Sequence, residues 1–134
     1  KNINLNKLKN ISLLKLALGN KKGEIKLYDS TNPKNHGGYS TDYKGNNYEL
    51  VQLNTFDNLF KGEMIDLVKI DVEGSELDVL KGMTNALSNK KIKNILLEMN
   101  EKDEFEIRGL LKSFGYYAEH IMYNMFWIKP EVSR

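Results

Sequence analysis

Two acidic residues, Asp71 and Glu73, directly follow a short apolar run over 65–70 and precede Gly74. The apolar run has the composition of a buried strand, and the residues after the glycine have helical spacing. In open α/β sheets, ligands bind beyond the carboxyl ends of the strands. Carboxylates at such an edge can act as general bases or hold a cation. These two acids are therefore candidates for chemistry.

Glu98 ends the next apolar segment, and Asn100 follows it. If the two apolar segments are neighbouring parallel strands, Glu98 and Asn100 face Asp71 across one crevice. Such an oxygen-rich set suits Mg²⁺ or Ca²⁺. Each acid also has a structural interpretation: Asp71 or Glu73 can cap the helix that follows, and Glu98 can be an ordinary strand-end acid. Lys69, inside an apolar strand, is expected to form an ion pair with one of them.

The remaining sequence predicts the elements that position these acids. Alternating or continuous apolar runs predict strands, at 12–18, 23–28, 48–53, 65–70, 92–99, 116–121 and 125–128. The first two are expected to form a hairpin, and so are the last two, through Tyr123-Asn124. Helices are predicted from apolar spacing and capping residues, after Thr55, after Ser75 with a break near Gly82, and from Asp103 to Phe114.

Residues 29–47 consist almost entirely of turn formers and polar groups. A loop of this length inside a compact domain is usually a lid, a binding loop or a disordered segment.

Composition excludes several classes of protein. With 134 residues and a net charge of +2, the chain is expected to be one domain with no basic surface for nucleic acid. It has no cysteine, which rules out disulfides and thiolate metal sites. No apolar run approaches the roughly 18 residues of a membrane span. A cytoplasmic location is expected.

The segment Asp66–Gly82, DLVKIDVEGSELDVLKG, closely resembles the signature of FkbM-type S-adenosylmethionine-dependent methyltransferases. Four other segments resemble family features in order and spacing: Leu16-Ala17-Leu18-Gly19-Asn20 with Gly23, Thr55-Phe56-Asp57-Asn58-Leu59, Ile95-Leu96-Leu97-Glu98, and Phe114-Gly115-Tyr116. The resemblance spans essentially the whole chain.

The resemblance implies an α/β fold: an incomplete Rossmann-like methyltransferase sheet, mainly parallel, with an antiparallel C-terminal hairpin. The chain contains no Gly-x-Gly, so residues 1–134 are interpreted as one partial domain, the C-terminal portion without the glycine-rich cofactor motif. In such a fold the strand at 12–18 is expected either to pair directly with 65–70 or to sit loosely. The opened sheet favours a homo-oligomer.

The resemblance also implies a function. The methyl donor is S-adenosylmethionine, and the acceptor is an oxygen of a sugar, glycolipid or natural product. Asp71, Glu73 and Glu98 are the expected catalytic residues, and Ala17 and Leu18 either contact the adenine ring or belong to the core. A divalent metal is the less favoured alternative. The competing hypothesis is a non-catalytic α/β binding or assembly module, and titration with S-adenosylmethionine discriminates between the two.

Overall fold

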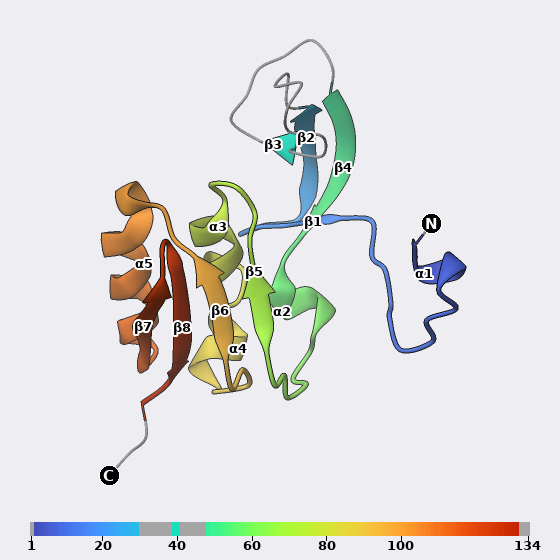
Figure 1. The fold of residues 1–134 in the computed structure, drawn as a ribbon. Coiled ribbons are helices and arrows are strands. Elements are labelled where there is room, and N and C mark those ends of the chain that lie inside the picture. Colours follow the sequence, from blue (N-terminus) through green and yellow to red (C-terminus); the bar gives the residue numbers. More distant parts are fainter. Residues whose placement is uncertain (1, 30–38, 41–47, 132–134) are drawn as a thin grey trace.

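The computed structural model describes residues 2–29, 39–40 and 48–131. Most of the predicted loop 29–47 lies outside them. The elements are α1 (Asn2–Leu5), β1 (Ala17–Leu18), β2 (Gly23–Asp29), β3 (Tyr39–Ser40), β4 (Tyr48–Asn54), α2 (Phe56–Leu59), β5 (Val68–Ile70), α3 (Glu76–Lys81), α4 (Thr84–Ser88), β6 (Ile95–Glu98), α5 (Glu101–Ser113), β7 (Tyr116–Met122) and β8 (Met125–Pro130). The strands form two four-stranded sheets, β1-β4-β2-β3 and β5-β6-β8-β7 (Figure 1).

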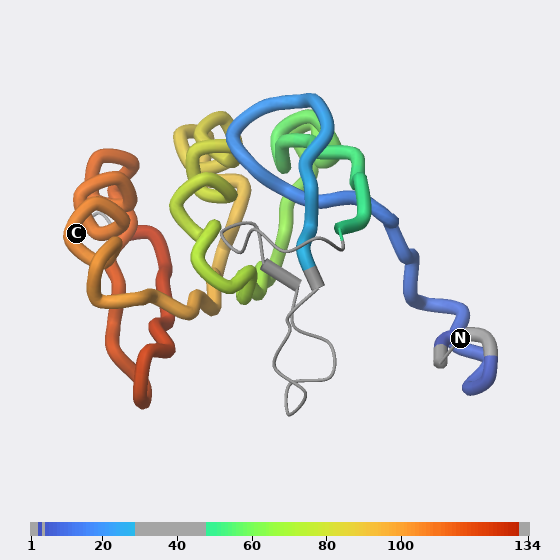
Figure 2. Tube along the Cα trace, turned by 90° about the horizontal axis from the view of Figure 1, so that it is seen from above, coloured from blue at the N-terminus to red at the C-terminus, as the bar shows by residue number. Residues whose placement is uncertain are grey.

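The second sheet is covered on one side by α3, α4 and α5 (Figures 1 and 2). Strand β5 runs parallel to β6, with Val68 opposite Ile95, and β8 lies antiparallel between β6 and β7. The predicted C-terminal hairpin is confirmed. Side chains alternate along each strand, so that Ile70 is buried whereas Lys69 is exposed.

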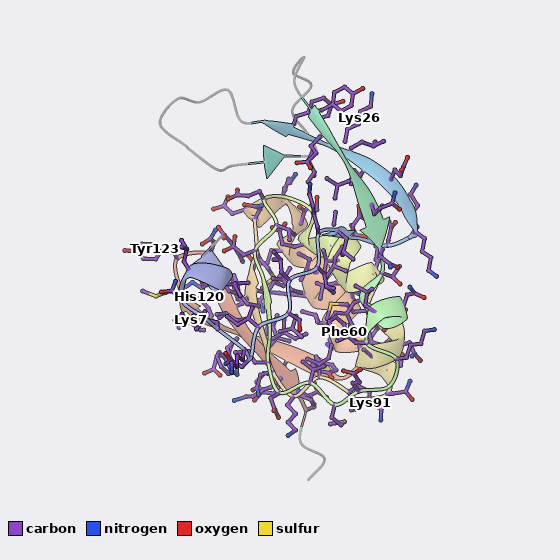
Figure 3. All side chains as sticks on the ribbon, turned by 90° about the vertical axis from the view of Figure 1, so that its right-hand side faces the viewer. Lys7, Lys26, Phe60, Lys91, His120 and Tyr123 are labelled. Atoms are coloured by element: carbon purple, nitrogen blue, oxygen red, sulfur yellow. The ribbon has the colours of Figure 1, made fainter. Side chains whose placement is uncertain are left out.

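The hydrophobic core belongs to this second sheet and its helices. Its buried members are Phe56, Ile70, Val79, Leu80, Met83, Ala86, Leu87, Ile92, Ile95, Leu97, Met99, Ile107, Leu111, Tyr116, Phe126 and Ile128. Among the described side chains of the first sheet, only Val51 is a buried apolar residue. The ribbon of β2 and β4, which carries Lys26, stands away from the helices (Figures 1 and 3). Among the described residues, the first sheet therefore buries much less apolar surface than the second.

Two predicted strand pairings are wrong. The hairpin between 12–18 and 23–28 does not form, because β4 pairs along the length of β2 and lies between it and β1. Direct pairing of 12–18 with 65–70 does not form either, because β1 is only two residues long and pairs with β4. The preceding Leu13 and Leu14 are 78% and 55% exposed. This stretch therefore matches the alternative of a loosely held segment.

The fold is mixed α/β, but a mainly parallel Rossmann-like sheet is not confirmed. Of the six strand pairings among the described residues, only β1–β4 and β5–β6 are parallel. No helix in the described ranges is long and apolar enough to cross a membrane.

The helices largely follow the sequence pattern. Thr55 caps α2 by accepting a hydrogen bond from the Asn58 backbone N–H at 3.2 Å, as predicted. Ser75 precedes α3 but makes no side-chain capping hydrogen bond. Helix α5 begins at Glu101 with Asn100 as its N-cap. The predicted cap at Asp103 is therefore wrong, because the helix begins almost one turn earlier.

The predicted break near Gly82 is confirmed, since α3 ends at Lys81 and α4 begins at Thr84. Two backbones approach closely at this break. A Cβ atom at Gly82 would lie 2.1 Å from the carbonyl oxygen of Gly19. The Gly82 carbonyl in turn accepts a hydrogen bond from the Asp57 N–H at 3.1 Å. This junction joins the end of β1 to the helical layer.

Candidate functional site

The carboxyl ends of β5 and β6 bring Asp71 and Glu98 together. Lys69 lies opposite Leu96 in the parallel register, and the next residue on the same face of each strand is one of the two acids. The register thus sets Asp71 and Glu98 side by side, and Glu98 contributes to the lowered pKa of Asp71. The ammonium of Lys69 lies 2.6 Å from Asp71 Oδ2, which confirms the predicted ion pair.

Electrostatics favour the ionised form of Asp71. The hydrogen bond from Lys69 holds the pKa of the Asp71 carboxyl below its usual value, desolvation opposes this effect, and the interaction with Glu98 lowers the pKa further. The same contact raises the pKa of Lys69. Both side chains reach solvent, at 56% exposure for Lys69 and 37% for Asp71. Water therefore screens the pair, so the ion pair contributes little to the stability of the fold.

Asn124 holds Glu98 from the turn between β7 and β8. Its side-chain amide donates a hydrogen bond to Glu98 Oε1, and its carbonyl accepts one from the Met99 N–H at 2.8 Å. The sequence pattern identified Tyr123-Asn124 only as a turn. Nothing in the local sequence indicates that this turn folds back onto the end of β6.

Glu73 is not part of this cluster. It is exposed, with φ of 50°, and among the described residues no hydrogen bond or ion pair joins its carboxylate to Asp71 or Glu98. The left-handed conformation continues at Gly74, with φ of 97°. The loop thus turns Glu73 toward solvent.

Glu76, the first residue of α3, was missed by sequence reasoning. It is only 2% exposed, and both carboxylate oxygens accept from the Gly74 N–H at 3.1 Å. A glutamate at the start of a helix ordinarily lies in solvent, so its type and position carry no signal of burial.

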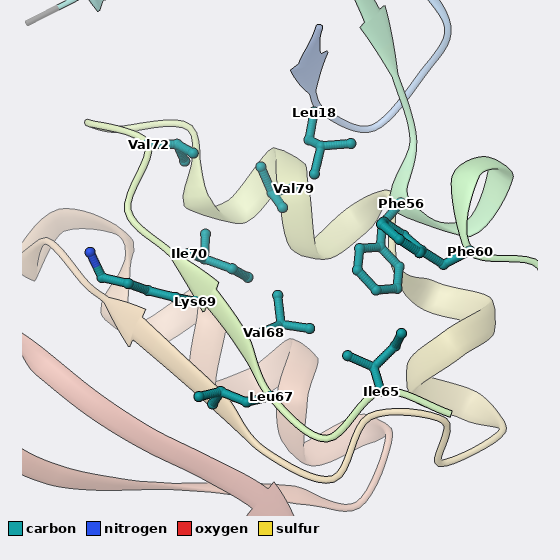
Figure 4. A pocket seen from close by; sticks show the side chains of 10 residues that line it. All are labelled: Leu18, Phe56, Phe60, Ile65, Leu67, Val68, Lys69, Ile70, Val72 and Val79. Carbon is teal, nitrogen blue, oxygen red and sulfur yellow. The ribbon is translucent and has the colours of Figure 1, made fainter. Parts of the chain in front are cut away.

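A pocket of about 420 Å³ follows the free edge of β5 (Figure 4). In the described residues β5 pairs with β6 alone, which leaves its other edge open. The lining residues are Leu18, Phe56, Phe60, Ile65, Leu67, Val68, Lys69, Ile70, Val72 and Val79. Four consecutive residues, 67–70, belong to this set, and successive side chains point to opposite faces of a strand. The pocket therefore wraps around the edge of β5.

Figure 4 shows the side chains of Leu18, Phe56 and Val68 pointing toward one another, whereas the nitrogen of Lys69 points away. The aliphatic stem of Lys69 borders the pocket, and its ammonium reaches the acidic pair. Leu18 lines this pocket, whereas Ala17, next to it in β1, is half-buried and is not among the lining residues.

No group of three or more His, Cys, Asp or Glu side chains suited to a metal ion is present in the part of the chain that the structure describes. Asn100, considered with the acids as an oxygen ligand, is the N-cap residue of α5.

A model of the methyltransferase FkbM domain matches residues 1–118. The chain belongs to the FkbM methyltransferase family. No curated protein and no solved structure matches it. The matched range of this FkbM-family chain contains Asp71 and Glu98 but ends before Asn124.

Proposed function

We propose that this FkbM-family chain is an S-adenosylmethionine-dependent methyltransferase that methylates a hydroxyl oxygen of a sugar, glycolipid or natural product. One observation carries the proposal: Asp71 and Glu98 meet at the carboxyl ends of two parallel strands, where ligands of α/β sheets bind. Lys69 keeps Asp71 ionised beside that meeting point.

S-adenosylmethionine, when bound, supplies a methyl group activated by its attachment to a sulfonium. In the transfer the C–S bond breaks and leaves a neutral thioether, a C–O bond forms, and the acceptor hydroxyl passes its proton to the Asp71 carboxylate and from there to solvent. Asp71 would accept the hydrogen bond of that hydroxyl. A carboxylate with a lowered pKa is a weak general base, so its larger contribution is to align the oxygen for in-line attack. Lys69 holds the Asp71 carboxylate in one orientation through its ion pair.

The pocket along β5 fits the adenine part of the donor. Its volume lies within the range of roughly 300–1,000 Å³ that is usual for ligand pockets, and nine of its ten lining residues are apolar. We assign Leu18 to this contact. Ala17 would support it from within β1. The sequence has no Gly-x-Gly, so the amino-acid part of the donor is not assigned to residues of this chain.

The test measures donor binding and methyl transfer by the full chain. Calorimetric titration with S-adenosylmethionine is expected to show micromolar affinity, and Leu18→Glu is expected to abolish it. Labelled methyl transfer to a panel of sugars and glycolipids should be lost in Asp71→Asn, while donor binding persists.

Asp66→Asn is the matched control, because Asp66 lies at the other end of the same strand segment and pairs with Lys93 at 2.7 Å. This variant should retain both properties. No binding of the donor at millimolar concentration would overturn the proposal.

The alternative function, a non-catalytic binding or assembly module, is favoured by the free edge of β5 and its apolar pocket. An extended peptide can add to such an edge through main-chain hydrogen bonds. Absence of donor binding together with an intact fold would favour this alternative.

A further inference from the structure

We propose that Glu76 is a positioning residue: its buried carboxylate fixes the turn over 72–75 that connects Asp71 to α3. The inference rests on the proposed function, in which Asp71 aligns the acceptor.

The contacts of Glu76 place it under the turn. Its side chain is 2% exposed, and it reaches back two residues so that both oxygens lie 3.1 Å from the Gly74 nitrogen. Burial of a carboxylate is costly unless hydrogen bonds compensate for the lost water. The hydrogen bond from the Gly74 N–H therefore compensates for part of the cost of burying Glu76, which an exposed glutamate on a helix would not need.

The turn needs such a restraint because its backbone is unusual. Glu73 has φ of 50° and Gly74 has φ of 97°. The left-handed region is unfavourable for a residue with a Cβ atom, and such conformations persist when the surroundings hold them.

Both ends of the turn are already anchored. Ile70 pairs with Leu97 of β6, and the Ser75 carbonyl accepts from the Val79 N–H at 3.0 Å. The Glu76 carboxylate adds a bond at the centre, on Gly74. Asp71 lies between the first anchor and this central bond, so the direction of its side chain depends on both.

The test uses three variants that change this bond in different ways. Glu76→Leu keeps the approximate size and removes the acceptor, whereas Glu76→Gln keeps one acceptor oxygen. Gly74→Ala leaves Glu76 intact but disfavours φ of 97°. Glu106→Gln is the control, because this glutamate lies in an exposed ion pair on α5.

The first readouts need neither donor nor acceptor. In Glu76→Leu the Gly74 amide should exchange with solvent roughly five- to tenfold faster, as expected for the loss of one hydrogen bond. The NMR signal of the Asp71 carboxyl should shift in Glu76→Leu and in Gly74→Ala, and stay close to wild type in Glu76→Gln and Glu106→Gln. If the Asp71 signal is unchanged in both Glu76→Leu and Gly74→Ala, the inference is overturned, whatever the outcome of the methyl-transfer test.

The second readout is kinetic. Both Glu76→Leu and Gly74→Ala should lower kcat about 100-fold, the effect of misplacing a reacting group by about 1 Å. Donor affinity should be unchanged in both variants. Glu76→Gln should keep most of the wild-type kcat. A fall in donor affinity that parallels the loss of kcat would indicate a merely structural role and overturn the inference. If Glu76→Leu does not fold, Gly74→Ala and Glu76→Gln decide the question by the same criteria.

Discussion

At the scale of single residues, the ion pair between Lys69 and Asp71 gives a direct test of the site's electrostatics. Lys69→Met should raise the pKa of Asp71 toward its ordinary value of 3.8, because the largest cause of the lowering is removed. An NMR titration of the carboxyl measures this shift. Lys93→Met should act on Asp66, whose pKa Lys93 lowers in the same way, and leave Asp71 unaffected.

The same shift predicts how stability depends on pH. The folded protein binds the Asp71 proton less tightly than the unfolded chain does. The ionised Asp71 carboxylate therefore stabilises the fold above the unfolded-state pKa, and this stabilisation is lost as pH falls through the folded-state pKa. Lys69 has a raised pKa, so its ammonium stabilises the fold below pH 10.5, and this stabilisation is lost as pH rises through the folded-state pKa. Lys69→Met should therefore flatten acid unfolding below about pH 4. An acid-unfolding curve identical to wild type would contradict this.

The side chain of Asp57 caps the start of α4 from a distant part of the chain. Its carboxylate accepts hydrogen bonds from the Asn85 and Ala86 N–H groups at 2.8 and 2.9 Å, in the first turn of α4. Asp57→Ala should lower the free energy of unfolding by about 1–2 kcal/mol, the usual effect of losing a helix cap. Urea unfolding measures the difference. In Glu106→Gln, which removes an exposed ion pair, the loss should stay below about 1 kcal/mol.

At the scale of elements, two glycines give opposite expectations for the same substitution. Gly82→Ala should destabilise the protein by more than about 3 kcal/mol, because the new Cβ would lie 2.1 Å from the Gly19 carbonyl oxygen. Gly109→Ala, inside α5, has no atom within 4 Å of the new Cβ. It should stabilise the protein by about 0.5–1 kcal/mol. Thermal unfolding compares the two, and similar effects of both substitutions would refute the close approach at Gly82.

Elements with local signals could be predicted from the sequence. The repeating apolar positions of α5, the Thr55 cap and the C-terminal turn all depend on residues close together in the chain. The pairing of β1 with β4 could not be predicted, because it joins Ala17 to Leu53 across an intervening strand and the long loop. Alternation of side chains identifies a strand but not its neighbour.

In the candidate site too, local features could be predicted from the sequence and long-range contacts could not. The strand ends predicted the meeting of Asp71 and Glu98. The pairing of Glu98 with Asn124 and the burial of Glu76 arise from tertiary packing. A turn residue and a glutamate at a helix start are commonly surface residues, so their residue types did not predict these contacts.

At the scale of the whole molecule, uncovered apolar surface predicts self-association. The stretch before β1 leads away from the body (Figure 2) and exposes Leu13 and Leu14. The open edge of β5 can pair with another chain. Light scattering should therefore show a mass that rises with concentration. Leu67→Lys, on the pocket lining and 50% exposed, should reduce the association.

Phe105→Lys is the control for that experiment, because Phe105 is 92% exposed on α5, and α5 packs beside β7, at the other end of the sheet from β5 (Figure 1). If this variant reduces the mass as much as Leu67→Lys does, association does not depend on β5. A constant monomer mass at every concentration would reject self-association altogether.

The family match ends before strand β8, although β8 is part of the second sheet. The family match ends at residue 118, within β7, yet β8 begins later and lies between β6 and β7. A protein cut at the end of the match would lose an interior strand together with buried Phe126 and Ile128. A truncation at residue 118 is expected to expose the edges of β6 and β7, so a shortened protein should extend at least through Pro130, the last residue of β8.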